Sequence, residues 1–76
     1  MKLGKLSCLI DEYTCVNTIS VMLNDNVLGL HDREDFYITV TGGLEKVEVL
    51  EHFLACNDNI YIIKLDLDSF KFVFKI

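Results

Sequence analysis

Asp66 and Asp68 are the two residues whose type and spacing come closest to a metal-binding motif. Two carboxylates separated by one residue emerge on the same face of a strand, where they can hold a divalent cation. No third acid lies close by in the sequence, and the segment lacks the glycine and the distant glutamate of a calcium-binding loop. We therefore interpret both aspartates as turn residues at the end of a strand.

The histidines and cysteines are the other residues with metal-binding or nucleophilic chemistry. His31 and His52 are the only histidines, and Cys8, Cys15 and Cys56 are too far apart to form the short ligand pair from which a zinc site is built. A cysteine nucleophile would also need a nearby base and a recognisable turn around it, which the sequence does not provide. We expect buried thiols, no metal, no other cofactor and no enzymatic activity.

Gly42 and Gly43 lie between a predicted strand and a predicted helix, which is a place where phosphate can bind. The lysine followed by serine or threonine that completes a phosphate-binding loop is missing, and Glu45 would repel an anion. We interpret the two glycines as the entry to a helix.

The predicted helix covers residues 42–56, the one segment with a convincing helical period. Apolar residues recur there at spacings of three and four and form one stripe: Leu44, Val47, Leu50 and Leu54, with Phe53 beside them. On this helix His52 would lie one turn from Glu48 and form a surface pair. The stripe requires a cover, which a sheet would provide.

The remaining segments alternate between apolar and polar residues, as half-buried strands do. We predict strands over 5–10, 13–23, 27–31, 36–40, 60–67 and 70–76, with a turn at 24–26 and a solvated loop at 32–35. The element order is then β-β-β-β-α-β-β. The fold class is α+β: one domain over residues 1–76, with a mainly antiparallel sheet and a single amphipathic helix packed on one face.

The net charge of −5 limits the classes of partner. Residues 11–58 carry ten acids against Arg33 and Lys46, so most of the surface repels phosphate. We therefore expect no direct binding to nucleic acid and none to membranes. The apolar runs are too short to span a bilayer, and the N-terminal run is too broken for a secretory signal, which favours the cytoplasm.

The acids suggest one candidate binding surface. Glu45, Glu48 and Glu51 would track along one side of the predicted helix, and the loop before it carries three more acids: Asp32, Glu34 and Asp35. A plain interpretation is a solvated face that keeps a small apolar protein in solution. The functional interpretation is a negative patch that docks on the basic surface of another protein, such as a nucleic-acid channel.

The outer face of the predicted C-terminal hairpin, residues 60–76, is the other candidate. Ile60, Ile62 and Val73 are apolar where a sheet facing water should be polar. Such a face favours self-association or strand addition to a partner. Alternatively, another segment of the same chain covers it, for example the predicted N-terminal hairpin.

These patterns favour a non-enzymatic protein-binding module. The first hypothesis is a small acidic inhibitor of the kind encoded by phages and mobile elements against nucleases and defence systems, acting in the cytoplasm of the host cell. The alternative is a structural or regulatory homodimer assembled through the C-terminal hairpin. A small enzyme or metal protein that uses Asp66, Asp68 and the histidines is the third hypothesis.

Overall fold

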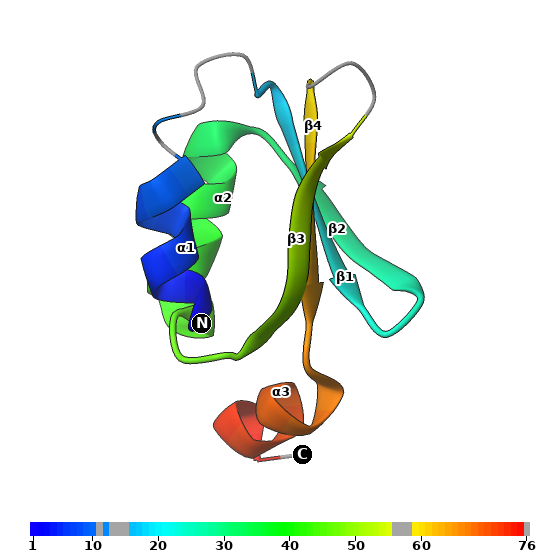
Figure 1. Cartoon of the computed structure of the whole chain (residues 1–76). Coiled ribbons are helices and arrows are strands. Elements are labelled where there is room, and N and C mark those ends of the chain that lie inside the picture. Colours follow the sequence, from blue (N-terminus) through cyan, green and yellow to red (C-terminus); the bar gives the residue numbers. More distant parts are fainter. Residues whose placement is uncertain (11, 13–15, 56–58, 76) are drawn as a thin grey trace.

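The computed structural model describes residues 1–10, 12, 16–55 and 59–75. Within these ranges the chain forms a four-stranded sheet and three α-helices, and a short π-helical turn, η1, extends α2 (Figure 1). The elements follow one another as α1 (Leu3–Ile10), β1 (Thr18–Leu23), β2 (Asn26–His31), α2 (Arg33–Thr39), η1 (Val40–Leu44), β3 (Val49–Ala55), β4 (Ile60–Leu65) and α3 (Leu67–Phe74). The α+β class is confirmed, whereas the single helix is not.

The sheet is mixed, with strand order β2-β1-β4-β3. The β1–β2 hairpin is antiparallel as predicted, and β3 and β4 form a second antiparallel hairpin that was not predicted, because residues 49–55 were assigned to a helix. The two central strands, β1 and β4, run parallel, with Thr18 opposite Ile60 and Leu23 opposite Leu65. A parallel pair needs a long crossover connection, and the chain between β2 and β4, with α2 and η1, provides it.

Helices α1 and α2 lie on the same side of the sheet and cover one of its faces (Figure 1). The covered face presents alternate residues of the central strands, among them Ile19 and Val21 of β1 and Ile63 of β4. These pack against one stripe from each helix, and the core that results is Leu3, Leu6, Ile10, Val16, Ile19, Val21, Phe36, Val40, Leu44, Val47, Val49, Tyr61, Ile63 and Leu65. Helix α3 lies at the end of the sheet and has no buried residue.

The predicted helix over 42–56 is wrong, because the helical segment formed by α2 and η1 ends at Gly42-Gly43, where a helix was predicted to begin. The backbone of Gly43 has φ 148°, which breaks the turn that η1 completes. Glycine just after a helix is a common stop signal, so the Gly42-Gly43 pair was open to both interpretations. The residues that follow form strand β3, and Leu50 is exposed there and not part of an apolar stripe.

The predicted loop at 32–35 and strand at 36–40 are replaced by α2. The carboxylate of Asp32 accepts a hydrogen bond from the backbone N–H of Asp35 at 2.7 Å, which caps the start of this helix. Phe36 and Val40 are buried at a spacing of four, whereas Ile38 is 60% exposed. Strand alternation had predicted that all three would share a face.

The two ends of the chain are also helical where strands were predicted. Leu3, Leu6 and Ile10 are buried on α1 at spacings of three and four. At the other end, the carboxylate of Asp66 accepts a hydrogen bond from the N–H of Ser69 at 3.3 Å and starts α3, so no hairpin forms over 60–76. Local capping by an aspartate outweighed the alternating pattern at both Asp32 and Asp66.

Three predicted strands, those over 13–23, 27–31 and 60–67, are confirmed for the larger part of their described residues as β1, β2 and β4. Strand β4 buries alternate residues as expected, β1 and β2 form a hairpin, and Asn24 in its turn adopts a left-handed backbone with φ 56°. The start of the predicted strand at 13–15, Cys15, Cys56, the predicted helix stop at 57–58 and Ile76 lie outside the described residues. Cys8, predicted to be buried, is exposed.

The helix stop at Gly43 gives a direct test of this chain path. Gly43→Ala places a side chain on a backbone with φ 148° and should lower the free energy of unfolding by about 1–3 kcal/mol. A methyl group there would meet only Phe74, at an ordinary 3.9 Å, so the cost lies in the backbone. Urea unfolding monitored by circular dichroism measures the loss.

Gly42→Ala is the matched control, because nothing lies within 4 Å of the added methyl group. It should leave the free energy of unfolding unchanged or raise it by up to about 1 kcal/mol. Equal effects of the two substitutions would contradict the helix stop at Gly43.

Candidate interaction surface

The face of the sheet opposite α1 and α2 is mostly apolar, with Thr18, Ser20, Glu51 and Lys64 among its apolar residues, and no element in the described ranges covers it (Figure 1). One row crosses all four strands, because Leu30 pairs with Ser20, Ser20 with Ile62, and Ile62 with Phe53. Directly opposed residues in a sheet point to the same side. The apolar residues that the register places on this side, which we call the open face, are Met22, Val27, Leu30, Phe53, Ala55, Ile60 and Ile62.

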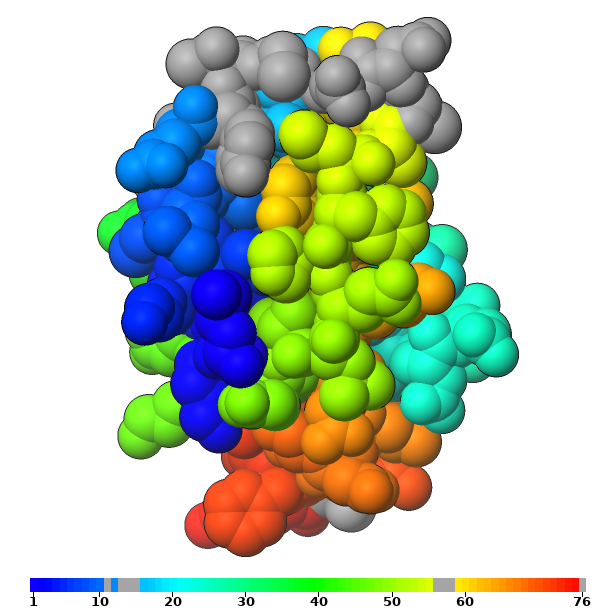
Figure 2. Space-filling view, viewed as in Figure 1, coloured from blue at the N-terminus to red at the C-terminus, as the bar shows by residue number. Residues whose placement is uncertain are grey.

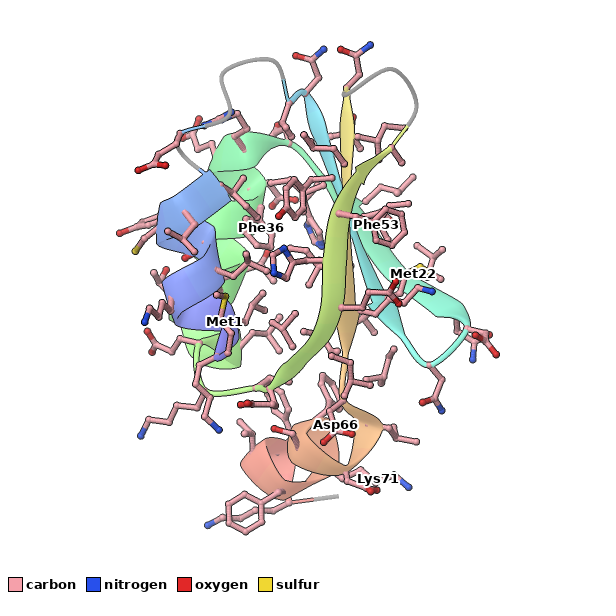
Figure 3. All side chains as sticks on the ribbon, in the orientation of Figure 1. Met1, Met22, Phe36, Phe53, Asp66 and Lys71 are labelled. Atoms are coloured by element: carbon pink, nitrogen blue, oxygen red, sulfur yellow. The ribbon has the colours of Figure 1, made fainter. Side chains whose placement is uncertain are left out.

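The outer strands of the open face carry exposed apolar side chains, whereas Ser20 on a central strand is only 7% exposed and Ile60 and Ile62 are half-buried. Leu30 is 67% exposed, Val27 57% and Phe53 39%. Figure 3 shows Phe53 and Met22 on the side of the sheet away from the helices, whereas Phe36 lies between the helices and the sheet. Single exposed apolar residues are ordinary, but a contiguous group is typical of an interaction surface.

The open face itself carries two charged residues, Glu51 and Lys64, whose charges balance each other. Glu51 lies opposite Lys64, and its carboxylate oxygen is 3.6 Å from the lysine Nζ. The same Nζ lies 6.0 Å from the centre of the Phe53 ring, within reach of a weak cation–π attraction. This corner of the face therefore carries no net charge that would select an acidic or a basic partner.

The acidic ridge predicted from Glu45, Glu48 and Glu51 does not form, because no helix carries these residues. Glu45 follows η1, Glu48 lies in the connection to β3, and Glu51 is on β3 itself. Glu48 and Glu51 are each engaged by a lysine. The role of the three glutamates in binding a partner stays a prediction.

The second predicted acidic group lies at the start of α2 and not in a loop. Asp32 caps the helix, Asp35 accepts from the Nδ1 atom of His31 at 2.7 Å, and Glu34 is exposed in the first turn. Acids are favoured at this end of a helix by its dipole. This group belongs to the helical layer, on the other side of the sheet from the open face (Figure 1).

The residues predicted for self-association lie on two different parts of the structure. Ile60 and Ile62 lie on the open face, as expected for an outward-facing side of that strand, and are half-buried. Val73 lies on α3 instead. Sequence reasoning missed Phe53 because it was assigned to a helix, and residues 49–55 show no apolar–polar alternation that would have revealed a strand.

The two histidines lie at opposite edges of the sheet and do not come together. His52 of β3 is hydrogen-bonded through Nδ1 to the Tyr61 hydroxyl at 2.6 Å, with the two rings stacked, so the predicted pair with Glu48 does not form. His31 ends β2. Within the described part of the chain, no group of three or more histidines, cysteines and acids could hold a metal.

The two aspartates that suggested a metal site also have structural positions. Asp66 caps α3, and Asp68 lies in the first turn of that helix, where an acid is favoured by the helix dipole. They therefore do not emerge side by side from a strand, as the metal-binding interpretation required.

Glu48 connects the N-terminal segment to the rest of the fold. Its carboxylate lies 3.1 Å from the Nζ of Lys2 and 3.1 Å from the amino group of Met1. The hydrogen bonds from Lys2 and from that amino group hold the pKa of Glu48 below its ordinary value. A backbone bond from Val49 N–H to the Met1 carbonyl, at 2.8 Å, reinforces the connection.

A lowered pKa in the folded state implies a contribution to stability that is present above the ordinary glutamate pKa of 4.5 and is lost as the pH falls through the folded-state value. Glu48→Gln should therefore be less stable than the wild type at pH 7. The difference should shrink as the pH falls from 4.5 to 3. Urea unfolding at each pH measures it, and the effect is small because solvent screens this pair.

Glu45→Gln is the control, since no described cation bonds Glu45. Its difference from the wild type should not shrink in the same way between pH 7 and pH 3. A Glu48→Gln difference that stays constant with pH would contradict the ion pairs at this site.

Two further results bear on what the chain could do. None of the helices in the described ranges has the length and apolar run that crossing a membrane requires. Comparison with protein-family models, with curated proteins and with solved structures finds no significant match. The open face is therefore the feature of this chain that points to a function.

Proposed function

We propose that the chain is a non-enzymatic protein-binding module and that the open face is its binding surface. The observation that carries the proposal is the row of side chains from Leu30 through Ser20 and Ile62 to Phe53, which crosses the whole sheet without a helix over it. Burial of such a row against a partner removes apolar surface from water, which is the main favourable term in association.

The dimensions of the face fit this role. Four strands spaced about 4.8 Å apart, with about 3.3 Å of rise per residue, give a surface roughly 15 Å wide and 20 Å long. Its projected area is therefore a few hundred Å², on the scale of the apolar patches that mark interaction sites. Contacts beyond the face would be needed to reach the ~800 Å² per partner of a standard interface.

A second copy of the chain is the occupant that the charges favour. The net charge of the chain is −5, yet the charges of Glu51 and Lys64 on the open face cancel each other. The acids at the start of α2 lie on the opposite side of the sheet, so two copies placed face to face keep them apart. Two sheets stacked in this way lie about 10 Å apart and interdigitate their apolar side chains.

The contact between two copies would be isologous, with the same surface contributed by each. This is the homodimer that the sequence raised as an alternative, moved from a C-terminal hairpin to the open face. The narrower hypothesis of a phage-type inhibitor stays a prediction, because the acids expected to dock on a basic surface are dispersed over the start of α2, the connection before β3 and β3 itself.

Ile62→Lys tests the proposed dimer, because it places a charge at the centre of the apolar row. Wild-type protein should sediment as a dimer at high micromolar concentration. The variant should dissociate at least about tenfold more readily, or about 1.4 kcal/mol. Sedimentation velocity over a concentration series measures both, and circular dichroism checks that the variant is folded.

Ile38→Lys is the matched control. Ile38 is 60% exposed on α2, in the helical layer, so the same change of charge there should leave the dimer intact. A wild type that is monomeric at high micromolar concentration would contradict self-association. Equal dissociation by the two variants would contradict the open face as its site.

The wider proposal of protein binding has its own test. Wild-type, Ile62→Lys and Ile38→Lys proteins serve as baits in parallel pull-downs from nuclease-treated lysate. If the wild type is monomeric, a partner retained by the wild type and the Ile38→Lys variant but lost with Ile62→Lys would place a different protein on the open face. No partner, together with a monomeric wild type, would contradict the module itself.

A further inference from the structure

A hollow of about 380 Å³ lies where the N-terminal segment, the turn before β3 and helix α3 meet. Figure 2 shows these three parts of the chain in contact at the lower end of the molecule. The volume is within the range of pockets that hold small ligands. The lining residues are Lys2, Lys46, Ser69, Phe72, Val73 and Lys75, none of which belongs to the open face.

The charge around the hollow is opposite to that of the whole chain. Three of the chain's seven basic residues line the hollow, although the net charge of the chain is −5, and no acid is among the described residues that line it. The neighbouring carboxylate, Glu48, is already bonded to Lys2 and to the amino group of Met1. Lys46 and Lys75 therefore leave positive charge facing the hollow, which would attract an anion.

The wall contributed by α3 is apolar. Phe72 and Val73 lie on it, and Phe72 is 84% exposed, the largest exposed fraction among the large apolar residues in the described ranges. The Ser69 hydroxyl oxygen accepts a hydrogen bond from the backbone N–H of Glu48 at 2.9 Å. The hydroxyl proton of Ser69 can therefore be donated to an acceptor in the ligand. The hollow thus combines cationic groups, one hydroxyl donor and an apolar wall.

We propose that this hollow binds a small amphipathic anion, meaning one anionic group carried on an apolar body such as an acyl chain or an aromatic ring. The lysines would hold the anionic group, and the apolar body would lie against Phe72 and Val73. An anion without a body would leave the apolar wall in water, and an apolar molecule without a charge would leave the lysines unused. The site is independent of the binding role of the open face.

Decanoate is the probe that combines both features. Titration into ¹⁵N-labelled protein should give saturable chemical-shift changes at the backbone amides of Lys46, Ser69 and Val73. Decanol, which has the body without the charge, and inorganic phosphate, which has the charge without the body, should each bind at least about tenfold more weakly. The amides of Ile62 and Phe53 report binding at the open face in the same spectra.

Lys46→Glu and Lys75→Glu should each weaken decanoate binding at least about tenfold. Lys71→Glu is the matched control: it changes the net charge equally and lies on α3, but does not line the hollow (Figure 3). It should bind as the wild type does. The proposal is overturned if decanoate gives no saturable shifts at the hollow, if the shifts fall on the open face, or if Lys71→Glu weakens binding as much as Lys46→Glu.

Discussion

The parallel pairing of β1 with β4 is the contact on which the rest of the structure depends. It joins two antiparallel hairpins into one sheet and fixes their register, with Ile19 beside Tyr61 and Ser20 beside Ile62. The first pair belongs to the face that the helices bury. The second pair lies on the other side, so the same register that builds the core also aligns the apolar row of the open face.

A chain of this length has few helices with which to cover a sheet, and this one uses two of them on a single face. Helix α3 lies at the end of the sheet and does not cover the other side (Figure 1). An apolar sheet face without a cover is costly in water. The uncovered apolar residues, together with an ion pair whose charges cancel, are the physical reason to expect a partner on the open face. The hollow beside α3 is a separate place, where an apolar wall lies next to lysines that have no anionic partner among the described residues.

The sequence predicted the α+β class, the β1–β2 hairpin and strand β4 correctly, because Thr, Val and Ile alternate clearly in those segments. The prediction from sequence failed where a single capping aspartate or a helix-ending glycine outweighed the periodicity of the apolar residues. Asp32 and Asp66 cap helices that alternation had assigned to strands, and Gly43 ends a helix where glycine was taken as a beginning. The prediction of an acidic ridge failed with the helix on which it depended, whereas Ile60 and Ile62 were placed on an outward face by alternation alone. The parallel β1–β4 pairing joins segments about forty residues apart, and no local pattern specifies it.

The proposed contact between two copies through the open face can be tested by an isotope-filtered NOE experiment on a mixture of labelled and unlabelled protein. If the copies meet there, intermolecular NOEs will connect the methyl groups of Ile60 or Ile62 in one copy with the Phe53 ring or the Leu30 methyl groups in the other. Intermolecular NOEs confined to the helical layer, or none in a sample concentrated to the millimolar range, would contradict it.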